Sequence, residues 1–538
     1  MVDLLFSIVP ILVILALLLI WRQPADITGV IGWAAVALVA LFAFNTSIEV
    51  ITRSTASGLI KSLPVSLIVA TSLLQMALLQ TTGALKRIIV FIKSISSENR
   101  SVQIMMISIG FGTLMVAVGA TPVSILPPIL LALGYSAYTS IALPAIGYDA
   151  LCTYALLGAP VVVFVDTVNK VFNKVGPEAY TLSQVGSIFW LFIPVVSTLI
   201  GFCMLWLVGR WKGVKDGFVP CITTGVVISV VSYFTNKVDN LVPLTGVICG
   251  VAVIVTMALY LKITGKKIFE RQHLTPDDIA CEKTMPLWKS LMPWGLLIAI
   301  VLILNLPQDI FKILYRDLLF PIKGLAVGPE TTPVANDINT RWLWNAYTWI
   351  FVSTILAIPF IVTKKSQITD AVKVWLKRAP RPVFAAAIFF AIGEIMGTSG
   401  FDMATKTFVK PSMVEILATN SANFFGSLYS LVAPFIGLLG GFITGSEAST
   451  IGMFGKYALK TASNLAFSPN IIILIAATVA FGGGLASVIS PAKLQNAAAS
   501  IDKMGEENKV IRVAFVFSII LTVVTALFAF AYVTLKVV

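Results

Sequence analysis

The sequence predicts an all-α polytopic membrane protein with about 12–16 membrane segments, arranged as two inverted repeats with broken helices or re-entrant hairpins. Three observations support this fold class. The 538 residues are 58% hydrophobic and 12% charged, with a mean hydropathy of +0.94, whereas soluble domains carry roughly 25% charged residues. Apolar runs long enough to cross about 30 Å of hydrocarbon recur from one end of the chain to the other. The order of these runs in the first half is repeated in the second half.

The first membrane repeat is predicted to occupy residues 1–210. Its apolar runs fall at 4–20, 27–45, 63–80, 101–118, 123–133, 137–163 and 183–209. The first run follows Asp3 rather than basic residues and ends at Trp21-Arg22 rather than at a small-residue cleavage site. We therefore expect it to be a retained helix and not a signal peptide.

Residues 211–289 are predicted to form a connection, and 290–538 the second membrane repeat. The connection holds two helices, at 218–234 and 241–261, and a charged cytoplasmic loop from Lys262 to Lys289. The apolar runs of the second repeat fall at 290–305, 345–362, 382–397, 424–443, 448–460, 469–488 and 513–535. Its long loop 306–341, rich in Pro, Gly and Asn, is expected to cap the external face. The helix-like portion from Asp309 to Phe320 is expected to lie along the interface.

The stretch 111–133 predicts a broken helix. It carries four helix breakers and two hydroxyls within an apolar run: Gly119, Pro122, Pro127, Pro128, Thr121 and Ser124. Proline removes a backbone donor and clashes with the preceding helical turn. In hydrocarbon, broken backbone is tolerated only inside protein or beside a water-filled cavity, and transporters place substrate sites at such breaks. The alternative is a simple kink.

The break has a counterpart in the stretch 440–460, and other segments of the two halves also correspond. Residues 63–65 match 381–383 around a proline, and 81–84 match 398–401 around a glycine. Residues 119–122 fall opposite 442–447, and 157–160 fall opposite 488–491. Weak internal symmetry of this kind is typical of transporters built from repeats.

Loop charges indicate that the repeats are inverted. The loop after residue 81 carries four basic residues against Glu98, and 363–381 is similarly basic, so both are predicted to be cytoplasmic. Their counterparts, 401–422 and 46–62, are nearly balanced in charge and are predicted to be external. Both termini are then also external.

Ionisable groups inside membrane runs are costly and by default functional. Glu447 is the leading candidate for ion coupling, because it lies in a cluster of hydroxyls that opens with a glycine and can hold a small carboxylate: Thr444, Gly445, Ser446, Ser449 and Thr450. Alternatively, Glu447 is an acid that caps a helix N-terminus. Asp149 is the second candidate, and its alternative is a buried acid tied to Tyr148, Tyr154 or a lysine.

Three further charges inside membrane runs are weaker candidates. Glu394 can cap the segment that follows it, and Lys493 can extend to the interface, while Lys456 lies beyond the second break. The glycines at 482–484 are expected to allow close helix packing rather than to bind a ligand.

Other function classes find little support. The net charge of +13 is scattered over loops, as cytoplasmic bias produces, so no nucleic-acid partner is expected. Four of the five cysteines lie in apolar runs without CxxC spacing, and the lone His273 lies in a charged loop. No phosphate-binding loop or metallohydrolase motif occurs, so neither an ATP-driven pump nor a membrane enzyme is expected, and no cofactor is needed.

Three motifs resemble a known family. Residues 119–125 with Pro128 and Gly134, residues 442–449 with Phe454-Gly455, and residues 489–494 are similar to segments of the bacterial L-lactate/glycolate permease family. The chain departs from that family at Leu114 and Met115, where the family carries an acidic residue, and at 147–151, where the family has an Asn-rich stretch. Asp149 is a candidate replacement for the acid that is missing at 114–115. The resemblance implies uptake of a 2-hydroxymonocarboxylate across the plasma membrane, coupled to H⁺ or Na⁺.

The leading interpretation is therefore a secondary symporter for a small monocarboxylate such as L-lactate or glycolate. Its site is expected near the bilayer midplane between the two breaks, with Glu447 and Asp149 as ion-coupling residues. The predicted substrate-binding residues are Gly119, Thr121, Ser124, Thr444, Gly445, Ser446, Ser449 and Thr450. Transport of another organic or inorganic anion and an uncoupled anion channel are the alternatives. Apart from substrate and membrane lipid no partner is expected, and a homodimer is one alternative for the oligomeric state.

Overall fold

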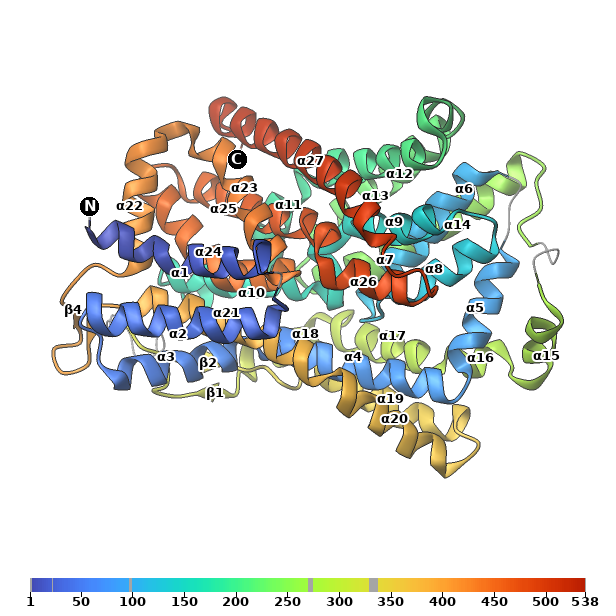
Figure 1. Cartoon of the computed structure of the whole chain (residues 1–538), viewed down its shortest axis with the longest axis horizontal. Coiled ribbons are helices and arrows are strands. Elements are labelled where there is room, and N and C mark those ends of the chain that lie inside the picture. The colour runs from blue at the N-terminus through green and yellow to red at the C-terminus, as the bar shows by residue number, and fades with distance from the viewer. Residues whose placement is uncertain (1, 22, 96–98, 270–273, 329–336, 538) are drawn as a thin grey trace.

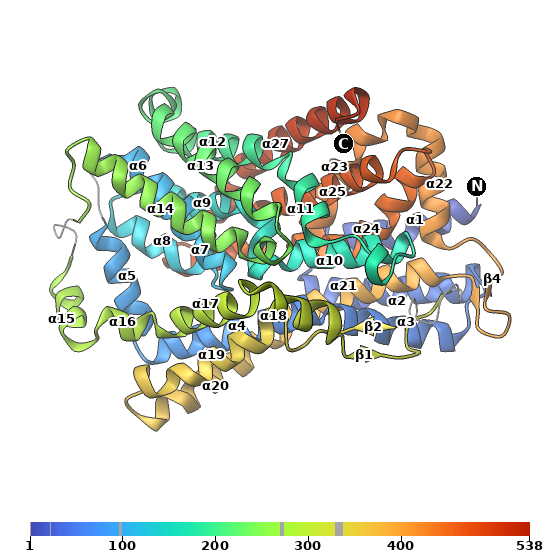
Figure 2. The ribbon, with the colours of Figure 1, turned by 180° about the vertical axis from the view of Figure 1, so that it is seen from behind.

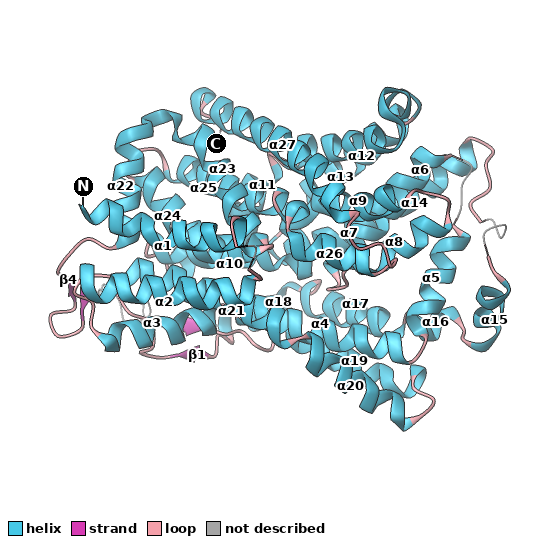
Figure 3. Ribbon diagram, viewed as in Figure 1, coloured by secondary structure: helices cyan, strands magenta, loops and turns pink. Residues whose placement is uncertain are grey.

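The computed structural model describes residues 2–21, 23–95, 99–269, 274–328 and 337–537, and almost all of them lie in helices (Figure 3). His273 lies outside the described residues. Two short antiparallel strand pairs occur: β1 (Pro321–Ile322) with β2 (Ile338–Asn339), and β3 (Phe401–Asp402) with β4 (Thr407–Phe408). The predicted all-α class is confirmed.

The helices of the first half are α1 (Val2–Leu19), α2 (Ala25–Ala43), α3 (Ile48–Lys61), α4 (Leu63–Thr81), α5 (Ala84–Ser94), α6 (Arg100–Ile104), η1 (Met105–Phe111), α7 (Gly112–Ala117), α8 (Pro122–Ala132), α9 (Ala137–Gly147), η2 (Tyr148–Tyr154), α10 (Ala155–Val171), η3 (Gly176–Glu178), α11 (Leu182–Trp190) and α12 (Ile193–Asp216). The connection contains α13 (Phe218–Asn236), η4 (Asp239–Leu244), α14 (Thr245–Ile263), α15 (Pro276–Thr284) and α16 (Leu287–Ser290).

The helices of the second half are α17 (Met292–Asn305), α18 (Gln308–Lys312), η5 (Ile313–Asp317), α19 (Ala346–Ile361), α20 (Lys365–Arg378), α21 (Pro380–Thr398), α22 (Met413–Phe425), η7 (Gly426–Leu428), α23 (Tyr429–Thr444), α24 (Glu447–Ser463), α25 (Pro469–Leu485), η8 (Ser487–Ile489), α26 (Pro491–Ala499) and α27 (Glu507–Leu535). In Figures 1 and 2, α2–α4 and α19–α21 occupy the lower part of the molecule, and α6–α14 and α23–α27 the upper part.

Eleven helical stretches in the described ranges are long and apolar enough to cross a membrane. A twelfth forms if α17 and Gln308–Asp317 count as one span bent by 88°. Three shorter apolar helices lie at Val2–Leu18, Pro122–Ala132 and Ala346–Ile361. The chain is therefore a multi-pass membrane protein, as its composition predicts.

Five segments that were expected to be charged loops contain helices: the loop 262–289 contains α15 and most of α16, and the other four contain the amphipathic helices α3, α5, α20 and α22. The apolar residues of these four helices recur at helical spacing, so each helix can bury one face and expose the other. In α5, for example, Leu85, Ile88 and Ile92 are buried while Lys86 is exposed. The charged residues lower the mean hydropathy of these segments, so the sequence predicted loops there.

The packing of the two halves is matched. α3 packs on α21 and α20 on α4, while α2 packs on α21 and α19 on α4. Taken in order along the chain, α2, α3 and α4 correspond to α19, α20 and α21, so these four contacts form two matched pairs. This correspondence supports two repeats, whereas their inverted orientation stays a prediction.

Each half contains two breaks in its helices. In the first half, the chain breaks between α7 and α8 at Gly119 (φ 85°), and again from η2 to Gly158, where Leu156 and Leu157 also have positive φ. In the second half, it breaks between α23 and α24 at Gly445 (φ 68°), and at η8 between α25 and α26. The helices that follow these breaks pack on helices of the other half. The helix after the second break of each half contacts the helix after the first break of the other, since α10 packs on α24 and α26 packs on α8.

Candidate functional site

The break between α23 and α24 places an acid at the start of a helix. Gly445 ends α23 in the left-handed conformation, which glycine adopts without a Cβ clash. Ser446 then caps α24, its side chain accepting a hydrogen bond from the backbone N–H of Ser449 at 3.4 Å. Glu447 is the first residue of α24, where the partial positive charge of the helix N-terminus favours a carboxylate.

The carboxylate of Glu447 is buried and only half satisfied. The residue is 2% exposed. Its Oε1 accepts a hydrogen bond from the Thr153 hydroxyl at 2.9 Å, while its Oε2 accepts none from any residue the structure describes. A Cβ at Gly484 would lie 2.6 Å from Oε2, so the carboxylate packs closely against this glycine. A buried oxygen of this kind is costly unless a proton, a cation or a water molecule satisfies it.

Asp149 faces the same space from the opposite half of the chain. It was expected in the middle of a helix but lies in η2, which ends where Leu156, Leu157 and Gly158 take positive φ. Its Oδ1 accepts a hydrogen bond from the Ser487 hydroxyl at 2.7 Å, and Lys493 lies within its electrostatic reach.

Asp149 and Glu447 line one small cavity together with Cys152, Phe481 and Gly484. Its volume of about 10 Å³ has room for about one water molecule. The structure thus brings together the two predicted ion-coupling residues, each from a different break. The cavity can hold a proton, a water molecule or a small cation, but it is too small for an organic anion.

The predicted hydroxyl cluster of the second break is mostly engaged with itself. The Thr444 hydroxyl donates to the Ser446 carbonyl at 2.9 Å and contacts the Thr450 hydroxyl at 3.2 Å. Thr450 also donates to the Ser446 carbonyl, at 2.8 Å. The buried hydroxyl of Ser449 is the exception, since no described residue is its hydrogen-bond partner.

The first break lies against other helices. At Gly119 an ideal Cβ would lie 2.4 Å from the Ser72 hydroxyl of α4, so the backbone approaches α4 closely there. Thr121 is exposed and Ser124 is partly buried. Among the described residues, no hydrogen bond joins 119–125 to 444–450. The predicted substrate residues of the two breaks are therefore not joined by a hydrogen bond among the described residues.

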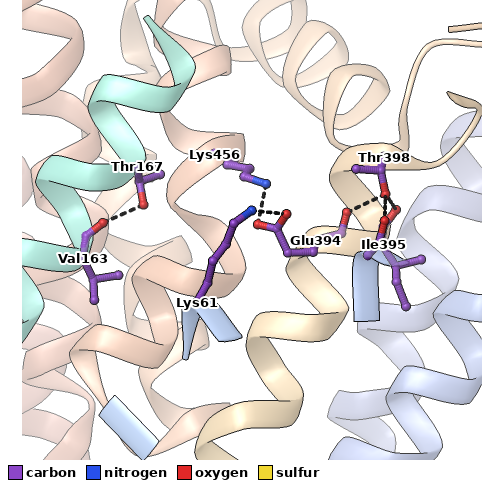
Figure 4. A network of polar contacts seen from close by, with 8 residues as sticks. Lys61, Val163, Thr167, Glu394, Ile395, Thr398 and Lys456 are labelled. Atoms are coloured by element: carbon purple, nitrogen blue, oxygen red, sulfur yellow. Dashed lines mark hydrogen bonds and ion pairs between the residues drawn. The ribbon is translucent and has the colours of Figure 1, made fainter. Parts of the chain in front are cut away.

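A second charged group lies on the other side of α24, and sequence reasoning recognised only part of it. Glu394 of α21 accepts hydrogen bonds from Lys61 at 2.5 Å and from Lys456 at 2.6 Å (Figure 4). Glu394 and Lys456 had been weighed as weaker candidates. Lys61 was counted only as a loop charge, because the helical period of α3 was not recognised.

The described residues form neither a metal-binding cluster nor a disulfide bond. No group of three or more of their His, Cys, Asp or Glu side chains could hold a metal ion. All five cysteines are free, and Cys152, Cys221 and Cys249 are buried.

Comparison with known proteins identifies relatives along nearly the whole chain. A family model described as L-lactate permease matches residues 3–536. The glycolate permease GlcA of Escherichia coli is 22% identical, over 98% of this chain and 96% of the relative. The L-lactate permease of Streptococcus iniae is 23% identical over 87% and 93%, and that of Bacillus subtilis is 21% identical over 97% and 94%.

Two solved structures of transporters are also similar. The YdaH transporter of Alcanivorax borkumensis has a TM-score of 0.44 at 11% identity, covering 90% of this chain and 88% of that one. MtrF of Neisseria gonorrhoeae has a TM-score of 0.43 at 14% identity, covering 92% and 86%.

Proposed function

Because the chain belongs to the L-lactate permease family, we propose that it is a secondary active symporter that carries a small monocarboxylate, such as L-lactate or glycolate, across the plasma membrane. Membership of this family implies transport and not catalysis. H⁺ or Na⁺ drives uptake in this proposal, and the ion binds at Glu447 with Asp149 beside it.

The observation that carries this proposal is the pair of carboxylates at the water-sized cavity. Two acids on separate halves of a membrane protein reach one buried space, and Oε2 of Glu447 accepts no hydrogen bond from a described residue. A proton or a cation there satisfies the oxygen and neutralises charge that is costly inside a membrane. Moving an unpaired anion against the membrane potential costs about 2.3 kcal/mol per 100 mV, so a co-transported cation also removes that barrier.

The hydroxyl-bearing breaks are the proposed walls of the substrate path. Ser449 offers a buried hydroxyl without a partner among the described residues, and Thr121 is exposed. The 10 Å³ cavity does not admit a monocarboxylate, so in this proposal the path opens only when the helices next to the breaks move apart. The breaks suit such a movement, because they leave the half-helices connected by single turns.

Uptake into proteoliposomes tests this function. The purified wild-type protein is reconstituted, and radiolabelled L-lactate and glycolate are offered under an inward H⁺ gradient or an inward Na⁺ gradient, each imposed alone. We expect accumulation above the external concentration under one of the two gradients and none without a gradient. Conductance that depends on neither ion would identify an uncoupled anion channel instead. Failure of both compounds to enter would contradict the substrate class, and a competition screen of other anions would replace it.

A further inference from the structure

Four charged side chains meet inside the helix bundle, on elements from both halves. We call Lys61, Lys170, Glu394 and Lys456 the lysine cluster. The Nζ atom of Lys61 lies 2.5 Å from Oε2 of Glu394, and the Nζ atom of Lys456 lies 2.6 Å from its Oε1. Figure 4 shows both lysine side chains pointing toward this carboxylate. Lys170 of α10 lies within electrostatic reach of the other three. The helices that supply them are in contact, since α21 packs on α3 and α24, and α24 packs on α10.

The lysine cluster carries more positive than negative charge. Three lysine side chains lie around one carboxylate, so basic groups outnumber acidic ones. Asp166, one turn before Lys170, is already bound by Arg341 at 2.9 Å. Lys460, one turn after Lys456, forms its own ion pair with Glu415. Buried charge without a partner is costly, so an anion that binds between the lysines offsets the excess.

The lysine cluster is also more accessible than the cavity at Glu447. The side chains of Lys61 and Lys456 are 17% and 20% exposed, whereas that of Glu394 is 7% exposed. Gly397, one turn after Glu394, has no side chain to cover Lys456, whose Nζ lies 3.6 Å from the ideal Cβ position. An anion can therefore approach the ammonium groups, while the carboxylate stays behind them.

We propose that the lysine cluster binds the carboxylate of the transported anion, an inference that rests on the proposed function. An arriving carboxylate shares Lys456 and Lys61 with Glu394 and gains Lys170 as a third donor. Charge-assisted hydrogen bonds of this kind are among the strong ones. Glu394 keeps the lysines in place and neutralises part of their charge when no substrate is bound.

Lys456 lies on the same helix as Glu447, so α24 carries both the proposed anion site and the proposed ion-coupling residue. The two residues are separated by about 13 Å along the axis of α24. The anion at Lys456 and the cation at Glu447 therefore act on one helix, next to a break. The lysine cluster also lies close to Asp166, whose partner Arg341 ends the loop 306–341.

Uptake kinetics of Lys456→Gln test this site. Glu394 keeps Lys61 as a partner in this variant, so it is expected to fold, which thermal unfolding of the purified protein checks. We expect its KM for L-lactate to rise about ten- to hundredfold with a maximal rate close to that of the wild type, because one charge-assisted hydrogen bond is lost. Lys456→Arg retains the charge and is expected to restore most of the affinity.

Lys460→Gln is the matched control, one turn further along α24 and paired with Glu415. Its KM is expected to stay at the wild-type value. L-lactamide, which lacks the carboxylate charge, is expected to compete poorly for the wild-type protein. A wild-type KM in Lys456→Gln, with L-lactate accumulated normally, would overturn the lysine site and leave the symport function intact. If the wild-type protein accumulates neither lactate nor glycolate, both proposals fall together.

Discussion

Glu447 combines two properties, a place at a helix N-terminus and an oxygen without a donor among the described residues. The helix N-terminus stabilises the negative charge of the carboxylate, while the oxygen without a donor leaves its hydrogen bonding incomplete. Glu447 also lines a small cavity together with Asp149, which an acid that served only the N-terminus of α24 would not require. The place of Glu447 beside this cavity therefore supports a role in binding the coupling ion.

Gly484→Ala tests whether the position of the Glu447 carboxylate matters for ion coupling. The added methyl group would lie 2.6 Å from Oε2 of Glu447 and push the carboxylate away from its place beside the cavity. We expect gradient-driven accumulation to be lost, together with a destabilisation of about 1–3 kcal/mol from overpacking. Gly209→Ala in α12, where a Cβ meets nothing within 4 Å, is the control and should change neither property. Normal accumulation by folded Gly484→Ala would show that the position of this carboxylate does not matter for coupling.

At the scale of residues, the sequence indicated the acids of the cavity but not their surroundings. Glu447 and Asp149 were conspicuous because they interrupt apolar runs. Thr153 was not conspicuous and Gly484 was expected only to allow helix packing, since a hydroxyl and a glycine in an apolar run have many ordinary roles. Their part in the site depends on contacts between residues that lie about 300 positions apart in the chain, as in the 294-residue separation of Thr153 and Glu447.

Among the helices, α15 shows how a segment outside the membrane runs is fixed. Lys93 of α5 binds Asp278 of α15 at 3.1 Å, and Arg87 lies 3.6 Å from Glu282. Burial by itself raises the pKa of Asp278, but hydrogen bonds from Thr275 and Lys93 outweigh it and hold the pKa below its usual value. The ionised form of Asp278 therefore stabilises the docking of α15 on α5.

Asp278→Asn is expected to loosen α15 by about 1.5–3 kcal/mol, because a hydrogen bond to a charged group is lost. Limited proteolysis of the 262–289 loop measures this opening. In the wild type the contribution is present above the unfolded pKa of about 4 and is lost as the pH falls through the lowered folded pKa. Asp277→Asn, at the exposed neighbouring position, should leave cleavage unchanged. Equal cleavage of the two variants would contradict the docking role.

At the scale of elements, apolar runs predicted most of the long helices, but α3, α5, α20 and α22 were expected to be loops. Hydropathy over a long window averages out the apolar face of a short amphipathic helix. The second break of the first half was missed for a different reason. Residues 148–158 contain no proline and a single glycine, Gly158, so only the match of 157–160 with 488–491 pointed to a change in the backbone there.

In the whole molecule, matched packing supports two repeats, and their orientation can be measured. Loop charges predict that Lys365 faces the cytoplasm and Lys406 the outside, and both residues are exposed. We expect an impermeant maleimide to label Lys406→Cys but not Lys365→Cys in intact cells, with the five native cysteines replaced. Labelling after permeabilisation controls for reactivity. Labelling of both sites in intact cells would contradict the inverted arrangement.

The central claim is that the cation binding at Glu447 drives accumulation of the anion. The most direct measurement compares Glu447→Gln with Glu49→Gln, a change of an exposed acid that also lies in the first turn of a helix. Both variants are assayed for gradient-driven accumulation and for exchange of L-lactate without a gradient. We predict that Glu447→Gln loses accumulation and retains exchange, while Glu49→Gln retains both. Wild-type accumulation by Glu447→Gln would contradict the account and leave Glu447 as a helix cap.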